Sequence, residues 1–191
     1  MQEATPLADA IKSLAKEHFE HVQGLRHHIH SHPELSFQEY ETSKFVKLEL
    51  DSIGIEDVKS CADTGWVGLI KGKKPDKKVV ALRADLDALP IQEENDVPYK
   101  SQNKGVMHAC GHDVHTSSLL GAARILYSLK DQFEGTIKLI FQPGEEKLPG
   151  GASKMIREGV LETPKATHQI LVGKLSTGFR ISSSICESGL P

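Results

Sequence analysis

The sequence of 191 residues has only three cysteines, and they lie far apart, at positions 61, 110 and 186. Three scattered cysteines do not make the disulfide framework of a small secreted domain, and they suit a reducing compartment. No apolar run approaches the roughly 20 residues that a membrane helix needs. The N-terminal segment MQEATPLADAIKSL also lacks the apolar core of a signal peptide. We therefore expect a cytoplasmic protein without a membrane partner.

The sequence also lacks blocks of like charge. The formal net charge is −3, and charged residues make up 26% of the chain, so no basic surface of the kind that binds nucleic acid is expected. Hydrophobic residues make up 38%, an ordinary share for a globular protein, and the length is sufficient to bury a core. These values predict a globular protein that does not bind nucleic acid.

Apolar residues recur at helical spacing in three long segments. We expect helices over residues 7–32, 38–53 and 114–130. Gly54 would end the second helix as its C-cap, and a further short helix would end near Gly159. Runs rich in Val, Ile, Leu and Phe indicate strands over 65–72, 78–85, 135–142 and, loosely, 168–175. The first two strands flank the lysine-rich turn KGKKPDKK, which indicates a β-hairpin.

The strand at 78–84, the helix at 114–129 and the strand at 136–141 follow one another as a crossover unit. Such a unit pairs its two strands in parallel, which predicts an α/β fold. The carboxyl ends of parallel strands lie on one edge of the sheet, and open α/β sheets bind their ligands there.

Side chains that can bind a metal accompany each of these three elements. Asp85 and Asp87 follow the first strand, and Glu145 and Glu146 follow the second. The segment MHACGHDVH (107–115) precedes the helix and adds Cys110, His112, Asp113 and His115. Thiolate, imidazole and carboxylate groups suit Zn²⁺, Mn²⁺ or Co²⁺. The sequence therefore predicts a divalent-metal site at this edge of the sheet.

The spacing of Cys110 and His112 suits two ligands on a loop rather than on one face of a helix, and Gly111 lets the backbone bend between them. Asp113 stands where an N-cap would. The helix N-terminus and a bound metal would both lower the pKa of the Cys110 thiol, which favours the thiolate.

Each group alone has a simpler interpretation. A Cys-Gly-His sequence can be incidental, the two aspartates can be solvated loop carboxylates, and the two glutamates can begin a helix, where the dipole favours them. Their coincidence at one sheet edge favours the metal site. The histidines at 27, 28, 30 and 32 lie on a separate helix, where we expect a structural role such as packing or hydrogen bonding near the site.

Four segments carry a resemblance to a known family: LRHHIHSHPELSFQEYETSKFV, LRADLDALPIQE, GVMHACGHDVHTSSLLGAARIL and FQPGEEKLPGGASKMIREGVL. In this order and spacing the chain resembles the two-metal amidohydrolases, which include bacterial aminoacylases, hippurate hydrolase, N-acetyl-diaminopimelate deacetylase and the plant auxin-conjugate hydrolases. The resemblance covers about residues 20–164. It implies a three-layer α/β sandwich in which helices flank a mixed, largely parallel sheet, as in zinc-peptidase catalytic domains.

The resemblance also implies a role for each site residue. Cys110, His112 and Glu146 would be ligands of two divalent metal ions (Mn, Zn or Co). Glu145 would be the general acid/base, and Asp87 would orient a metal ligand, in the hydrolysis of an N-acyl amino acid or small peptide-like amide by a metal-activated water. The weaker candidates, for the surroundings of the site or for a further ligand position, are Asp85, Asp113, His115 and His168.

The family's chains are considerably longer than this one. We therefore expect residues 1–164 to be the N-terminal part of the catalytic domain and residues 165–191 to be a divergent tail, with the lid and dimerisation domain absent, as after a frameshift or an early stop. An exposed sheet edge and uncovered apolar surface would then favour self-association. The alternative to an enzyme is a metal-binding fragment without turnover, and a third hypothesis is a metal-free α/β domain.

Overall fold

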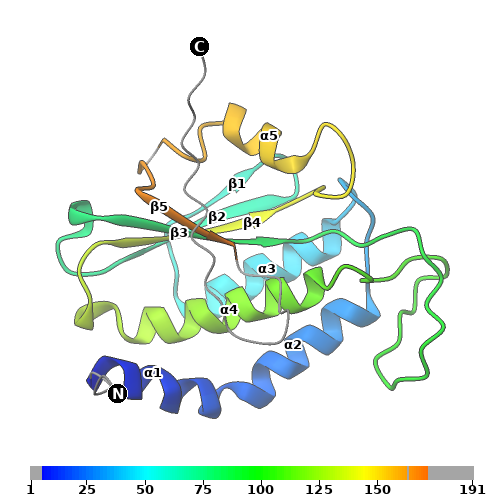
Figure 1. Cartoon of the computed structure of the whole chain (residues 1–191), viewed down its shortest axis with the longest axis horizontal. Helices are drawn as coiled ribbons and strands as arrows, with labels where there is room; N and C mark the ends of the chain where they lie inside the picture. The colour runs from blue at the N-terminus through cyan, green and yellow to red at the C-terminus, as the bar shows by residue number, and fades with distance from the viewer. Residues whose placement is uncertain (1–5, 163, 172–191) are drawn as a thin grey trace, which may run out of the picture.

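The computed structural model describes residues 6–162 and 164–171, which form a five-stranded sheet with helices on both faces (Figure 1). The strands lie in the order β1-β2-β4-β3-β5. Their bounds are β1 Val58–Cys61, β2 Gly65–Lys71, β3 Val79–Asp85, β4 Thr136–Gln142 and β5 His168–Leu171. The α-helices are α1 Pro6–Glu17, α2 Phe19–Ser31, α3 Tyr40–Ile53, α4 His112–Ser128 and α5 Gly151–Arg157. Short 3₁₀ turns span Pro75–Lys77 and Lys130–Gln132.

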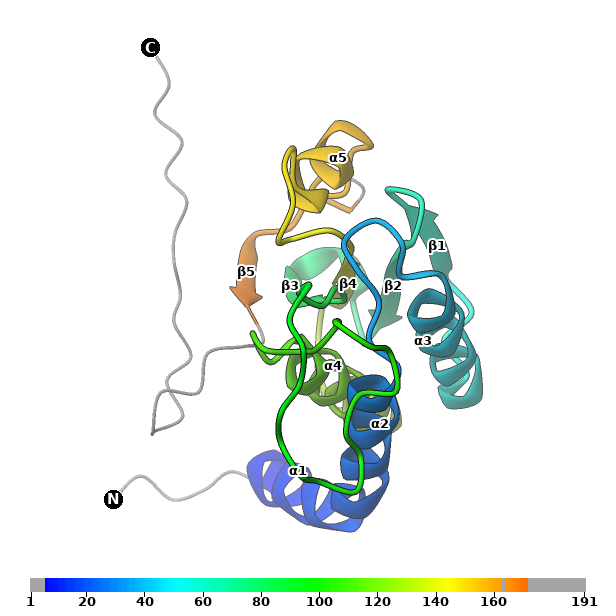
Figure 2. The same ribbon diagram turned by 90° about the vertical axis from the view of Figure 1, so that its right-hand side faces the viewer.

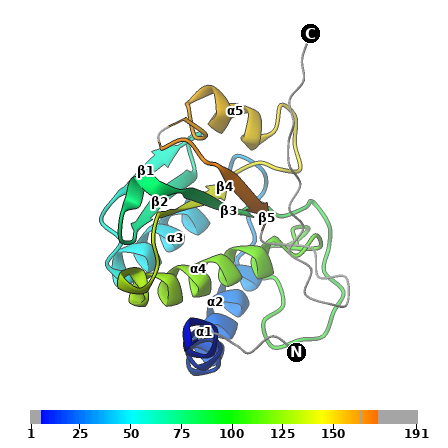
Figure 3. The same ribbon diagram turned by 60° about the vertical axis from the view of Figure 1, so that its left-hand side comes forward.

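The helices and the sheet form three layers. Figures 2 and 3 show α1 to α4 on one side of the sheet and α5 on the other. The larger core lies between the sheet and the helices α2, α3 and α4, and includes Leu50, Leu119 and Phe141. A smaller core on the α5 side includes Ile140 and Met155. Because β2 is antiparallel to β1 and β4 while β3 is parallel to β4 and β5, the predicted sandwich around a mixed sheet is confirmed.

The single helix predicted over 7–32 is wrong, because the chain forms α1 and α2 with a break at His18. Burial differs between the two helices: no residue of α1 is buried, whereas α2 buries Leu25 and Ile29. Phe19, the first residue of α2, is 62% exposed.

The predicted hairpin of residues 65–85 is also wrong. β2 and β3 do not pair with each other, because β4 lies between them. Six of the seven residues of β4 are buried, and a strand that is buried on both faces is typical of the interior of a sheet, where it has a neighbour on each side. The segment β1 was not expected as a strand, and it pairs with β2 at the sheet edge.

The crossover from β3 through α4 to β4 is parallel, as predicted. Its register pairs Asp85 with Gln142, so both strands end at the same edge of the sheet. The helix predicted over 38–53 is α3, and Gly54 ends it in the left-handed conformation at φ +90°. The short helix before Gly159 is α5.

β5 extends the sheet beyond β3, and its register places His168 opposite Val80. It accounts for the first half of the strand predicted over 168–175, and the second half lies outside the described residues. Among the described helices, none has the length and apolar character required to cross a membrane.

Candidate metal centre

Three chain segments meet at the carboxyl edge of β3 and β4. Asp85 is the last residue of β3, and Asp87 lies two residues further along the chain. The segment after β4 carries Glu145 and Glu146, and the third segment is the start of α4, whose first residue is His112. The predicted acidic and imidazole side chains therefore lie at one edge of the sheet.

His112 is held by Asp87. The preceding residue, Gly111, adopts φ +83°, a left-handed conformation that turns the chain into the helix. Nδ1 of the imidazole lies 2.9 Å from the main-chain O of Asp87 and 3.2 Å from its Oδ1. Because both acceptors face Nδ1, the neutral ring carries its proton there and presents the lone pair of Nε2 to the site. Metal-binding histidines are commonly oriented in this way.

Asp87 is buried and tightly hydrogen-bonded. Its Oδ2 accepts the hydroxyl proton of Ser36 at 2.6 Å and the main-chain N–H of Glu146 at 2.9 Å. Burial alone would raise the pKa of Asp87, but His112, Ser36 and the main-chain N–H groups of the two glutamates lower it to about 2. Asp87 is therefore ionised at neutral pH and favours a positive charge beside it.

The carboxylates also act on His112. Burial alone would lower the pKa of this imidazole, but Asp87 and Asp85 raise it to about 9. Without a cation, the ring therefore holds a second proton at neutral pH. A metal ion can replace that proton, because a metal ligand must be neutral imidazole and the same carboxylates stabilise the metal's charge.

His112 belongs to two groups of side chains that could bind a metal. In the first group, one potential ligand atom from each residue lies within 4.8 Å of the others; its members are His112, Glu145 and Glu146. The second group meets the same limit and consists of Asp85, His112 and His115. Nε2 of His112 lies 3.9 Å from Oε1 of Glu146. Nδ1 of His115 is buried without a hydrogen-bond partner among the described residues, and lies 3.7 Å from Oδ2 of Asp85. This donor set, with one buried nitrogen left free, fits a divalent metal ion.

Cys110 is exposed and belongs to neither group. A hydrogen bond to Glu146, partial burial and the charges of Glu146, Glu145 and Asp87 raise the pKa of its thiol to about 11. The expectation that the helix N-terminus would lower this pKa is wrong for the metal-free protein, because the nearby carboxylates outweigh the helix. Only a cation placed beside the sulfur would favour the thiolate.

Asp85 is paired with Arg83 of the same strand. Nη2 and Nε of Arg83 lie 2.5 Å and 3.0 Å from its Oδ1. Burial would raise the pKa of Asp85, but His115 and Arg83 lower it. The main-chain O of Asp85 accepts the hydroxyl proton of Thr116 at 2.8 Å, which joins β3 to α4. Asp85 thus places a negative charge beside His112 and His115 while one of its oxygens is bound by the guanidinium.

Asp113 does not cap α4, contrary to expectation. The N-cap is Gly111, and Asp113 is the second residue of the helix. Its Oδ2 instead accepts hydrogen bonds from Nε of Arg26 and Nδ1 of His30, both at 2.8 Å. The physical reason is burial: a carboxylate that is 1% exposed is stabilised more by two side-chain donors, one of them a guanidinium, than by one main-chain N–H.

His30 extends this contact into the loop between β3 and α4. Its Nε2 lies 3.1 Å from Oε1 of Glu93, whose Oε2 accepts the main-chain N–H of Ser101 at 2.6 Å. The loop descends beside α2 in Figure 2. His30 has the structural role expected of it, whereas Glu93 was missed, because nothing in the sequence distinguishes it from the exposed Glu94.

His168 does not reach the cluster. It pairs in register with Val80, at the amino end of β3, whereas Asp85 ends that strand. Val80 and Asp85 are five residues apart in β3, which is roughly 17 Å along a strand. His168 is exposed, and its Nδ1 contacts Thr167. His108 belongs to neither group of candidate metal ligands; it is 4% exposed, and burial lowers its pKa to about 4.

Comparison with known proteins identifies relatives of the chain. The sequence profile of peptidase family M20/M25/M40 matches residues 81–181. An N-acyl-L-amino acid amidohydrolase of Geobacillus stearothermophilus is 47% identical over 154 residues, which cover 81% of this chain and 41% of that protein. Thermostable carboxypeptidase 2 of Saccharolobus solfataricus is 50% identical over 157 residues, which cover 81% of this chain and 40% of that protein.

A solved structure gives the same result. The crystal structure of a dinuclear metal binding peptidase of the M20 family from Bacillus subtilis aligns with a TM-score of 0.78 and 40% identity. The alignment covers 84% of this chain and 45% of that one. The chain spans about two-fifths of the length of the curated relatives it matches, at 41% and 40%.

Proposed function

The chain belongs to peptidase family M20/M25/M40, and on that premise we propose that its site hydrolyses the amide bond of N-acyl amino acids or small peptide-like amides with two divalent metal ions. The pairing of His112 with Asp87 carries the proposal, because it directs Nε2 towards the two glutamates. The named relatives, an amidohydrolase and a carboxypeptidase, support the substrate class.

We assign His112, Glu146 and Cys110 as the metal ligands that this chain supplies. His112 and Glu146 already face each other at 3.9 Å, and Glu146 is the main cause of the raised pKa of the Cys110 thiol. When bound, Mn²⁺, Zn²⁺ or Co²⁺ supplies a Lewis acid for the amide carbonyl and lowers the pKa of water towards about 7. Asp85 and His115 belong to the surroundings of His112, with His115 the further candidate for a ligand.

Glu145 is assigned to proton transfer. Of the two adjacent glutamates, Glu146 has its carboxylate 3.9 Å from Nε2 of His112, which leaves Glu145 free to act as a base. Its carboxylate accepts a proton from the attacking water and donates it to the nitrogen of the leaving amine. Asp87 takes no proton, because its pKa of about 2 keeps it ionised, and it holds the His112 ring in place.

The second candidate function is metal binding without turnover. The observation that favours it is the position of Cys110 and His168: the first lies outside both groups of ligand atoms, and the second lies at the other end of β3. Within the described residues, the donors come from one edge of the sheet only. A site of this kind could hold a metal without orienting a substrate.

The test is hydrolysis of N-acetyl amino acids and hippurate by the full chain with added Mn²⁺, Co²⁺ or Zn²⁺. We expect metal-dependent release of the amino acid, abolished in Glu145→Gln while metal binding persists. Glu94→Gln, an exposed glutamate in the loop, is the matched control and should leave the rate unchanged. Metal binding without turnover would favour the second candidate, and a protein that binds no metal would contradict both.

We also propose a cytoplasmic location and self-association. The scattered cysteines support the location. Within residues 6–162 and 164–171 the outer edges of β1 and β5 have no partner strand, which supports the association, because an unpaired edge can pair with another chain. Sedimentation velocity over a range of concentrations should show a dimer or larger species. A monomer at every concentration would contradict self-association.

A further inference from the structure

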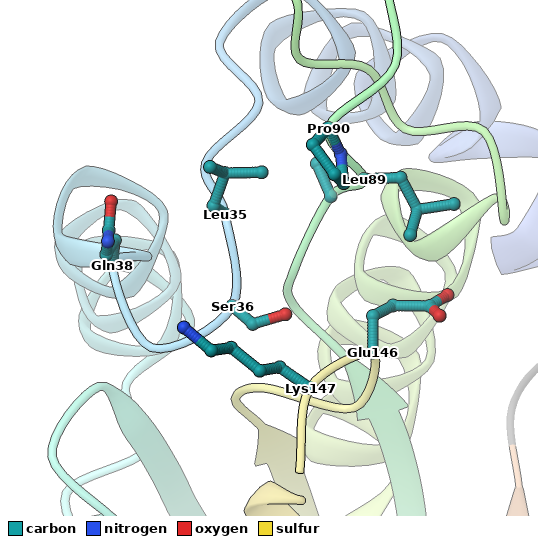
Figure 4. A pocket seen from close by; sticks show the side chains of 8 residues that line it. Leu35, Ser36, Gln38, Leu89, Pro90, Glu146 and Lys147 are labelled. Atoms are coloured by element: carbon teal, nitrogen blue, oxygen red, sulfur yellow. The ribbon is translucent and has the colours of Figure 1, made fainter.

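A pocket lies beside the metal centre and has no part in the chemistry described so far. Its volume is about 280 Å³, and we call it the side pocket. In Figure 4, Leu35 stands on one wall, Leu89 and Pro90 stand on the opposite wall, and the turn of Glu146 and Lys147 forms the floor. The two walls belong to segments that are distant in sequence but joined by the bridge between Leu35 and Ala88.

The side pocket adjoins the metal centre through two of its lining residues. Glu146 lines the pocket, and its carboxylate lies 3.9 Å from Nε2 of His112. Ser36 also lines the pocket and donates its hydroxyl proton to Asp87 at 2.6 Å. A group bound in the side pocket is therefore next to the proposed metal ligands.

The walls are mainly apolar, and their main chains are fixed. Leu35 and Leu89 are half-buried, and both contribute to the lining. The main chain of Leu89 exchanges two hydrogen bonds with Met107, each of 3.0 Å, and Ala88 donates to Glu34 at 2.8 Å. Because the walls are already ordered, an apolar group gains the free energy of burial without first ordering the protein.

Lys147 is the cation among the lining residues. In Figure 4 its aliphatic stem runs along the floor, and its ammonium end extends towards the side of Gln38. The stem covers apolar surface, and the charged end stays at the rim. Two occupants are possible. If the apolar walls determine binding, the pocket holds an apolar group such as an acyl chain, and if the ammonium determines it, the pocket holds the charged amino-acid half.

We propose that the side pocket holds the acyl group of the substrate, in the range from butyryl to benzoyl. This rests on the proposed function, in which Glu145 donates a proton to the leaving amine. Glu145 must face the amine half of the amide, and it is not among the lining residues, whereas Glu146 is. The acyl half extends to the other side of the scissile carbonyl, where Leu35 and Leu89 lie.

The experiment is calorimetric titration of the Mn²⁺-loaded Glu145→Gln chain, which should bind metal without hydrolysing the ligands, with N-acetyl-, N-butyryl-, N-hexanoyl- and N-benzoylglycine. Each methylene that enters the pocket should tighten binding by up to about fourfold. Leu89→Ala should reduce the advantage of benzoyl over acetyl by about tenfold and leave N-acetylglycine unchanged. Ile91→Ala, an exposed apolar neighbour outside the pocket, is the matched control and should change neither value.

Lys147→Met separates the two possible occupants, because it keeps the stem and removes the charge. We expect it to leave the dependence on acyl length intact. If it weakens all conjugates by one factor, and Leu89→Ala changes the preference for the amino acid instead of the acyl group, the pocket holds the amino-acid half and the proposal is overturned. Equal affinity across the acyl series, or no binding of any conjugate, also overturns it. Because the readout is binding, a lack of hydrolysis would count only against the proposed function.

Discussion

Asp87 contacts His112 through two oxygen atoms: its main-chain O lies 2.9 Å from the imidazole Nδ1, and its Oδ1 lies 3.2 Å from the same nitrogen. Ser36 and the main chain of Glu146 bind the remaining carboxylate oxygen. One aspartate therefore joins the turn after β3, the turn after β4 and the start of α4. The direction of Nε2 on His112 therefore depends on Asp87, which is buried from solvent.

Replacing this aspartate should weaken metal binding. In Asp87→Asn the negative charge is lost, and the ring of His112 is no longer held by an ionised acceptor. We expect about 10- to 100-fold lower affinity for Zn²⁺ or Mn²⁺, measured by competition with a chelating dye. Asp63→Asn, which alters an exposed carboxylate in a left-handed turn, is the control. Equal affinity in the two variants would contradict the role given to Asp87.

The stability of the metal-free protein should fall as the pH rises. The pKa of His112 is about 9 in the folded protein, above its ordinary value of 6.5, because of Asp87 and Asp85. The stabilisation is fully present below pH 6.5 and is lost as the pH rises through 9. Urea unfolding should show a decrease of up to about 3 kcal/mol across this range. His112→Gln should lack this slope, and a flat profile in the unchanged protein would contradict the pairing.

The elements were largely predictable from local patterns, whereas the pairing of strands was not. The helical spacing in α3 and α4 and the apolar run of β4 depend on neighbours in sequence. The position of β4 between β2 and β3 depends on burial in the whole sheet, and no feature of residues 65–85 reveals it. The sequence of the turn between β2 and β3 is the same whether the two strands pair with each other or with β4, so it cannot distinguish a hairpin from this arrangement.

The residues at the strand ends of the site were predictable from the sequence, whereas the partners of Asp113 were not. Asp85, Asp87, Glu145 and Glu146 meet because parallel strands end at one edge, a rule that needs only the order of elements. The partners of Asp113 lie 83 and 87 residues away in the chain, at His30 and Arg26. Such partners are fixed by three-dimensional packing, so a local rule assigned Asp113 to a cap that the structure does not form.

Cys110 should be unreactive as long as no metal is bound. The pKa of its thiol is about 11 because of Glu146, partial burial and the other carboxylates, so little thiolate is present at pH 7.5. Alkylation by iodoacetamide, followed on the Cys110 peptide by mass spectrometry, should rise with pH up to about 11. Glu146→Gln should move the midpoint towards the ordinary thiol value. A midpoint below 9 in the unchanged, metal-free protein would contradict the effect of Glu146.

The stability of the fold should depend strongly on His30. Its two ring nitrogens contact Asp113 and Glu93, which are 1% and 2% exposed, so removing the ring leaves two buried carboxylates short of a partner. We expect His30→Ala to lower the free energy of unfolding by about 3–5 kcal/mol in urea titration. His27→Ala, on the same helix, removes a ring that stacks on Tyr99 and should cost about 1 kcal/mol.

A second substitution separates loss of charge pairing from loss of packing. In His30→Ala combined with Glu93→Gln, one of the two unpaired carboxylates is gone. The double variant should therefore be less destabilised than the sum of the single ones, by an interaction of about 1–3 kcal/mol. Additive effects would mean that His30 stabilises the protein by filling space, and that the loop carrying Glu93 is held against α2 by its other contacts, such as the hydrogen bond from Gln102 to Ser31.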